Sequence, residues 1–141
     1  MHSMLPMPNA RILIVEDEAI TVAALKRELI ALGYEVAGTA DTTETALAVA
    51  DREKPDLVIM DITLSGNLDG IAAAVAIRGH VGAPVVFLTA HADAGTIERA
   101  MLAGPFGYLL KPFNAAELSA AIQVALSQSR KELDRRPEPH R

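Results

Sequence analysis

Short apolar segments and longer amphipathic segments alternate five times along this chain. The apolar segments are rich in Val, Ile and Leu and cover residues 11–15, 35–39, 57–60, 84–88 and 106–110. Apolar runs of this length predict buried strands, and segment 35–39, which is the weakest, is expected at an edge of the sheet. The intervening segments suit helical crossovers, which join parallel strands with a right-handed turn. The sequence therefore predicts an α/β fold in which five helices cover a doubly wound, five-stranded parallel sheet.

The helix boundaries follow from capping residues and from breakers. Residues 20–32 show helical spacing, and Gly33 ends that helix. The side expected to be buried consists of Ile20, Ala24, Leu25, Leu29 and Leu32. Asp41–Glu44 and Asn114–Glu117 both have the pattern of a capping box, and Asp93 is expected to cap a helix that reaches about Leu102. Further helices are expected over 71–78 and from Asn114 onward, with a last buried stripe at Leu118, Ile122, Ala125 and Leu126.

One domain accounts for nearly all of the chain. We expect it over residues 10–128, with a flexible extension over 1–9 and a polar tail or linker start over 129–141. At 141 residues the chain can bury a core without disulfides, and it has no cysteine. No apolar run approaches the ~18–20 residues of a membrane span, and the first residues lack the pattern of a secretory signal. We therefore expect a cytoplasmic protein that does not enter a membrane.

The charge distribution argues against direct binding of nucleic acid. The chain has a net charge of −5, and its last twelve residues contain five Lys or Arg against three Asp or Glu. The rest of the chain is therefore more acidic than the whole. Contacts to phosphates need clustered basic residues, so we expect no direct nucleic-acid partner.

Polar residues of particular types follow four of the five predicted strands. They are Glu16 with Asp17, then Asp61, Thr89 and Lys111. Because ligands bind at the carboxyl ends of strands in open parallel sheets, we expect these side chains to meet at one edge. Three carboxylates held close together favour a cation, and without His or Cys ligands that cation is Mg²⁺. A carboxylate between Mg²⁺ and a lysine suits a phosphoryl acceptor, because charge on the transferring group is neutralised from both sides.

At these positions the chain resembles the receiver domains of two-component response regulators. The segments that carry the resemblance are Val15–Glu18 (VEDE), Ile59–Asp61 (IMD), Leu88–Ala90 (LTA) and Tyr108–Phe113 (YLLKPF). The resemblance covers about residues 11–126. It implies a flavodoxin-like fold with strand order 2-1-3-4-5, of which receiver domains are a well-known example.

The resemblance also implies a role for each site residue. Asp61 would accept a phosphoryl group from a phosphohistidine on a histidine kinase or a histidine phosphotransfer protein. Asp17, Glu16 (partly through water) and Asp61 would hold Mg²⁺ together with the backbone carbonyl of Thr63. Lys111 would pair with the phosphoryl oxygens. The protein would assist its own phosphorylation and dephosphorylation without turning over an external substrate.

The same resemblance implies a conformational response. Thr89 would move to hydrogen-bond the phosphoryl group, and Tyr108 would turn inward. The face formed by the fourth helix, fifth strand and fifth helix would then change and bind a downstream protein, and a homodimer is also compatible with the family. Lys111–Pro112 would be a cis peptide, which X-Pro bonds permit.

Two features depart from the family pattern. Ser65 stands where the family usually has proline, and the segment 63–70 is one residue longer than the common loop. Thr63 and His91, each two residues past a site residue, border the phosphoryl group in the family. We hypothesise that they set its lifetime.

Other interpretations remain open at this stage. Glu16 and Asp17 could simply begin a helix, and Asp61 could be a turn residue. Thr89 could hydrogen-bond local backbone groups, and Lys111 could be a solvated strand end. Tyr108 could serve only for packing, and His91 could be an ordinary loop residue. A haloacid-dehalogenase-type phosphatase would need a second acid where Thr63 stands. A pseudo-receiver would dock partners without phosphate, and a nucleotide- or flavin-binding relative would need a Gly-rich loop that is missing after the first strand. Only residues 127–141 follow the predicted core, so the chain is expected to be a stand-alone receiver or part of a larger regulator or hybrid kinase.

Overall fold

Five parallel strands form a single sheet in the computed structural model, which describes residues 10–64, 69–90 and 93–135. The strands are β1 (Arg11–Val15), β2 (Glu35–Ala40), β3 (Leu57–Asp61), β4 (Val85–Thr89) and β5 (Gly107–Leu110). Their order is β2-β1-β3-β4-β5, and every neighbouring pair is parallel. The predicted fold class and strand order are therefore confirmed, with the weak strand β2 at an edge.

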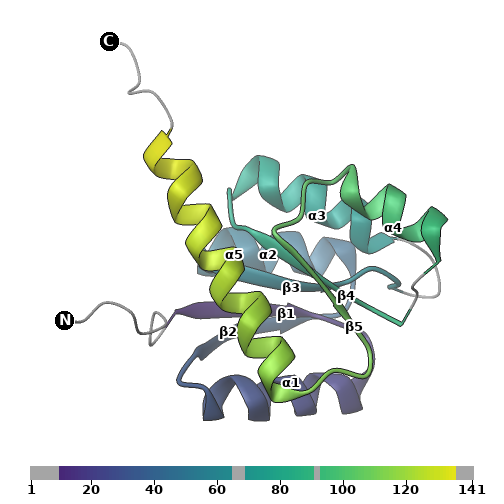
Figure 1. Ribbon diagram of the computed structural model, residues 1–141, viewed down its shortest axis with the longest axis vertical. Helices are drawn as coiled ribbons and strands as arrows, with labels where there is room; N and C mark the ends of the chain where they lie inside the picture. The colour runs from purple at the N-terminus through teal and green to yellow at the C-terminus, as the bar shows by residue number, and fades with distance from the viewer. Residues whose placement is uncertain (1–9, 65–68, 91–92, 136–141) are drawn as a thin grey trace.

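Five helices connect and flank the strands. They are α1 (Ala19–Ala31), α2 (Thr43–Glu53), α3 (Asp69–His80), α4 (Ala94–Met101) and α5 (Ala115–Arg135). Figure 1 shows α1 and α5 on one face of the sheet and α2, α3 and α4 on the other. Two helical layers therefore cover the sheet, as the alternation of elements predicts.

The core has one cluster on each face of the sheet. Every residue of β3 and β4 is buried, and β1 is buried except for Arg11. Leu25 and Leu29 of α1 pack on one face with the predicted stripe of α5, while small alanines of α2 and α3 pack on the other. Central strands that are covered on both faces need continuous apolar sequence. These strands could therefore be recognised although apolar and polar residues do not alternate along them.

Three helix starts were predicted from capping residues, and one of them is shifted. Asp93 caps α4 by accepting the N–H of Thr96, and Asn114 and Glu117 form a reciprocal capping box at α5. The box at α2 was placed one residue too early. Thr42 is the N-cap there, because its hydroxyl accepts the Thr45 N–H at 3.1 Å and the Thr45 hydroxyl accepts the Thr42 N–H at 3.1 Å.

The expected buried side of α1 was wrong at Ile20. Leu25 and Leu29 are fully buried, but Ile20 is 82% exposed. The helix geometry explains this difference. At about 100° per residue, Ile20 lies roughly 140° around the axis from Leu25 and roughly 180° from Leu29. The Ile20 side chain therefore cannot share the face that these two leucines turn to the sheet.

Helix α5 continues past the expected end of the domain at residue 128 and reaches Arg135. Neither Gly nor Pro occurs in residues 115–135, so nothing in the sequence stops the helix before Pro137. Glu132 lies 3.6 Å from Arg78 of α3. Arg78 also donates to the Gly104 carbonyl at 2.7 Å and stacks 4.6 Å from the ring centre of Phe106. Arg78 thus joins α3, the segment before β5 and the far end of α5.

Among the described residues, no helix has the length and apolar character needed to cross a bilayer. The residues expected to form the N-terminal extension (1–9) and the last part of the tail (136–141) lie outside the described chain.

Candidate phosphoryl-acceptor site

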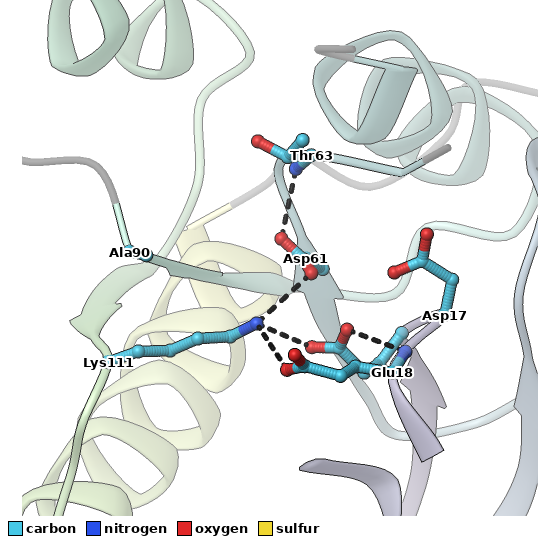
Figure 2. A pocket seen from close by; sticks show the side chains of 7 residues that line it. Asp17, Glu18, Asp61, Thr63, Ala90 and Lys111 are labelled. Atoms are coloured by element: carbon cyan, nitrogen blue, oxygen red, sulfur yellow. Dashed lines mark hydrogen bonds and ion pairs between the residues drawn. The ribbon is translucent and has the colours of Figure 1, made fainter. Parts of the chain in front are cut away.

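The strand ends bring together the acidic and basic residues that the sequence singled out. Glu16 and Asp17 follow β1, Asp61 is the last residue of β3, and Lys111 follows β5. They border a pocket of about 400 Å³ at this edge of the sheet. Its full lining is Glu16, Asp17, Glu18, Asp61, Thr63, Ala90 and Lys111, most of which are labelled in Figure 2.

Asp61 is held from two sides. Its carboxylate is almost fully buried, with 6% of the side chain exposed. Oδ1 accepts the backbone N–H of Thr63 at 2.9 Å, and Oδ2 accepts a hydrogen bond from Lys111 Nζ at 3.3 Å. These two contacts fix the orientation of the carboxylate, and Figure 2 shows it directed into the pocket. A carboxylate that is buried, oriented and open to one pocket has the geometry of a nucleophile.

The Lys111 ammonium is surrounded by carboxylates. Nζ lies 3.0 Å from Glu16 Oε1, 3.3 Å from Asp61 Oδ2 and 3.7 Å from Glu18 Oε1. Burial by itself would lower the pKa of Lys111, but the ion pair with Glu16 and the charge of Asp61 outweigh it, so its pKa lies above the ordinary value. Lys111 therefore stays protonated and supplies a fixed positive charge.

Glu16 is the most deeply buried acid of the site, at 2% exposed. Burial, and then the neighbouring Asp61 carboxylate, raise the pKa of Glu16 to about 7, even though Lys111 opposes the rise. One ammonium thus does not compensate the negative charge of two adjacent buried carboxylates. A divalent cation would favour the ionised form of Glu16 and remove this imbalance.

Glu16, Asp17 and Asp61 could hold that cation. One oxygen of each carboxylate lies within 4.8 Å of the oxygens of the other two. Asp17 is the exposed member of the group, and Glu16 and Asp61 are buried. An all-oxygen donor set with a partly open side fits Mg²⁺, which keeps some of its waters and binds phosphate oxygens.

Thr89 and Tyr108 lie on the sheet beside the pocket and do not line it. Thr89 ends β4 and is fully buried, and Tyr108 is half-buried on β5. Tyr108 is the register partner of Phe87, two residues before Thr89. Because side chains two residues apart point to the same face of a strand, Thr89 and Tyr108 share one face of the sheet. Burial, and then the charge of Asp93, raise the pKa of Tyr108, so its hydroxyl stays neutral.

The structure also bears on the remaining predictions for this region. The Lys111–Pro112 peptide bond is cis, as expected. Thr63 lines the pocket and its N–H contacts Asp61. His91 and Ser65 lie outside the described residues, and so does the middle of the long loop from Thr63 to Gly70.

Glu18 was not predicted as a site residue. It ends the acidic motif Val15–Glu18, and in the structure it lines the pocket and faces Lys111. Its backbone N–H also donates to Glu16 Oε2 at 3.0 Å. The only signal in the sequence was a third acid directly after the first strand, which also suits the start of a helix.

Known proteins share this sequence pattern. The sequence profile of the response regulator receiver domain matches residues 12–123. The transcriptional regulatory protein PdtaR of Mycobacterium tuberculosis (strain ATCC 25618 / H37Rv) is 43% identical over 120 residues, which are 85% of this chain and 58% of the relative. The transcriptional regulatory protein YvrH of Bacillus subtilis is 37% identical over 123 residues, 87% of this chain and 52% of the relative. The chain thus spans only a little over half of these relatives.

Two solved receiver domains share the fold over almost their whole length. The signal receiver domain of a modulated diguanylate cyclase from Desulfovibrio desulfuricans G20 superposes with a TM-score of 0.81 at 38% identity, covering 86% of this chain and 97% of that one. The receiver domain of the sensor histidine kinase PA1611 from Pseudomonas aeruginosa PAO1 gives a TM-score of 0.76 at 34% identity, covering 84% and 98%. In that structure a magnesium ion is coordinated in the active-site cleft.

Proposed function

The chain belongs to the response regulator receiver domain family, and we propose that Asp61 is the residue that carries its phosphoryl group. As a receiver it is a signalling domain of two-component systems. The observation that supports Asp61 most directly is its pair of contacts: one carboxylate oxygen is held by the Thr63 N–H and the other by Lys111, at the wall of the pocket.

The chemistry is the transfer of one phosphoryl group between two side chains. An Asp61 oxygen forms the new P–O bond while the P–N bond to a donor histidine breaks, and the nitrogen keeps the electron pair. Lys111 would turn from the carboxylates to the phosphoryl oxygens and neutralise part of their charge. Glu16, Asp17, Asp61 and the Thr63 carbonyl would hold Mg²⁺, which supplies further positive charge at the same oxygens.

The donor would be a histidine kinase or a histidine phosphotransfer protein, and the response would reach a downstream protein through α4, β5 and α5. Large apolar side chains are exposed on these elements: Met101, at the end of α4, the adjacent Leu102, Leu110 of β5 and Val124 of α5. Thr89 and Tyr108 would connect this face to the pocket, because they lie on the same face of the sheet in the neighbouring strands β4 and β5. A second copy of the chain is a further candidate for the same face.

The central test is phosphorylation with a small-molecule donor. On incubation with acetyl phosphate and Mg²⁺, we expect the intact mass to rise by one phosphoryl group, and we expect Asp61→Asn to abolish the rise. Asp51→Asn, an exposed change on α2 that also removes one carboxylate, is the matched control and should be phosphorylated normally.

The outcomes separate the rival functions. Absence of any mass gain with every donor, together with no binding of beryllofluoride and Mg²⁺, would indicate a pseudo-receiver. Sustained hydrolysis of p-nitrophenyl phosphate over many turnovers would indicate a phosphatase and contradict the proposal that the domain acts only on its own aspartate.

The lifetime of the phosphoryl group is proposed to depend on Thr63 and His91. The Thr63 hydroxyl is buried and has no hydrogen-bond partner among the described residues, so it could hold an attacking water. We expect the isosteric Thr63→Val to slow hydrolysis of phospho-Asp61 about threefold, because a methyl group cannot orient that water. His91→Ala is tested in parallel. Decay of the phosphorylated protein after removal of the donor measures the rate, and unchanged decay in both variants would rule the proposal out.

A further inference from the structure

Glu18 contacts Lys111 from a position unlike that of the other two acids. It precedes α1 as the N-cap residue, and its side chain makes no capping hydrogen bond. Glu18 is 63% exposed, whereas the side chains of Glu16 and Asp61 are 1% and 6% exposed. Figure 2 shows its carboxylate reaching Lys111 from the side of the pocket opposite Thr63.

The Glu18 carboxylate is held in this orientation by a second contact. The Thr21 hydroxyl donates to Oε1 at 2.6 Å, and the same oxygen lies 3.7 Å from Lys111 Nζ. An exposed glutamate that is free to rotate would gain little from one ion pair. Here the threonine one helical turn further on restricts that rotation, so the carboxylate stays near the ammonium.

From these contacts we propose that Glu18 is a positioning residue that holds Lys111 in its phosphoryl-free orientation and competes with the phosphoryl group for the ammonium. The inference rests on the proposed function of Asp61. Glu16 and Asp61 belong to the metal and acceptor sites, so they remain engaged after phosphorylation. Glu18 is the third carboxylate within 4.0 Å of Lys111 in the described chain, and its pair must loosen when Lys111 turns to a phosphoryl oxygen.

This competition predicts that removing the Glu18 charge favours the phosphorylated state. Beryllofluoride with Mg²⁺ serves as the probe, because it is a non-covalent stand-in for the phosphoryl group and reports a binding equilibrium. We expect Glu18→Gln to bind beryllofluoride about three- to fivefold more tightly than wild type, the modest size reflecting the exposure of the pair. Fluorine NMR or calorimetry measures the affinity. Glu44→Gln, an exposed change on α2 with the same loss of charge, should leave it unchanged.

Two further variants distinguish an ion pair between Glu18 and Lys111 from a general repulsion between the Glu18 charge and the bound anion. Glu18→Asp keeps the charge, but it shortens the side chain by one methylene and favours capping of the helix backbone. We expect it to behave like Glu18→Gln, because the pair with Lys111 is lost in both. Thr21→Val should shift the affinity in the same direction by a smaller factor, because it frees the Glu18 carboxylate.

The binding measurements distinguish a failure of this inference from a failure of the proposed function. If wild type binds beryllofluoride and Glu18→Gln binds it equally well, the inference is overturned while the role of Asp61 stands. Wild-type affinity in Glu18→Asp combined with tighter binding in Glu18→Gln would also overturn it, in favour of simple repulsion. If wild type neither binds beryllofluoride nor takes a phosphoryl group, both the function and the inference are overturned.

Discussion

Lys111→Met is expected to slow phosphorylation of Asp61 by acetyl phosphate about 100-fold, the lower end of the cost of removing one preorganised donor that stabilises a transition state. The ammonium is the one cation that contacts Asp61 among the described residues, at 3.3 Å. Methionine fills a similar volume without the charge, so the space that the Lys111 side chain occupies stays filled. The loss would therefore be electrostatic.

The same substitution should affect metal binding in the opposite direction. Lys111 occupies the space between Glu16 and Asp61 and neutralises part of their charge. Without it, the carboxylates have no competing cation, and we expect Mg²⁺ to bind several-fold more tightly. A variant that binds Mg²⁺ more tightly and accepts the phosphoryl group more slowly would show that Lys111 competes with the metal but assists the transfer.

Two measurements test the prediction on one protein sample. Intact mass against time gives the phosphorylation rate, and calorimetry gives the Mg²⁺ affinity. Lys131→Met, an exposed change on α5, is the matched control and should alter neither quantity. A Lys111→Met protein with the wild-type rate would show that Lys111 has no part in transfer. Weaker Mg²⁺ binding would show instead that the ammonium supports the metal site.

Gly70→Ala is expected to destabilise the fold by about 2–4 kcal/mol, which spans the upper part of the typical range for overpacking in a core and extends beyond it. A Cβ at this position would lie 1.9 Å from the carbonyl oxygen of Asp61 and 2.8 Å from Ile62 Cα. Both are backbone atoms, so no side chain can rotate away. The Gly70 N–H also donates to the Ile62 carbonyl at 2.9 Å, which holds the start of α3 against the end of β3.

The site should be affected together with the stability. Relief of the clash requires α3 to move away from the strand end that carries Asp61, so any folded Gly70→Ala protein should also be phosphorylated more slowly. Urea unfolding followed by circular dichroism gives the free energy of unfolding. Gly79→Ala in the same helix is the control, because a Cβ there meets no atom within 4 Å and alanine favours helix by about 1 kcal/mol. Equal unfolding midpoints for the two variants would contradict the prediction.

The sequence was sufficient for the architecture and for most of the site. Continuous apolar runs such as Leu57–Met60 identify central strands, because a strand covered on both faces has no polar side. Once the strands are parallel, their carboxyl ends must meet at one edge. Asp61 and Lys111, fifty residues apart, could therefore be placed together from order and spacing alone.

Helix ends were predicted less well, because several residues compete for each role. Asp41 and Thr42 both suit an N-cap, and the hydroxyl pair of Thr42 and Thr45 decided between them. Ile20 fits an apolar pattern in the sequence, yet its angle around the helix axis from Leu25 and Leu29 places it on the exposed side. Residues past 128 read as a polar tail, yet they continue α5 to Arg135, where Glu132 lies near Arg78.

What only the tertiary structure decided is the set of contacts between segments far apart in the chain. Glu18 is one acid among several in the sequence, and it becomes a partner of Lys111 only because β1 and β5 end at the same edge of the sheet. Gly70 carries no sign of its closeness to Asp61, and the raised pKa of Glu16 depends on burial that no local pattern reports. The sequence by itself determined that Glu16, Asp17, Asp61 and Lys111 gather at the pocket, because strand order and residue type suffice for these four. Their distances, burial and competition for one ammonium depend on the packing of all the layers together.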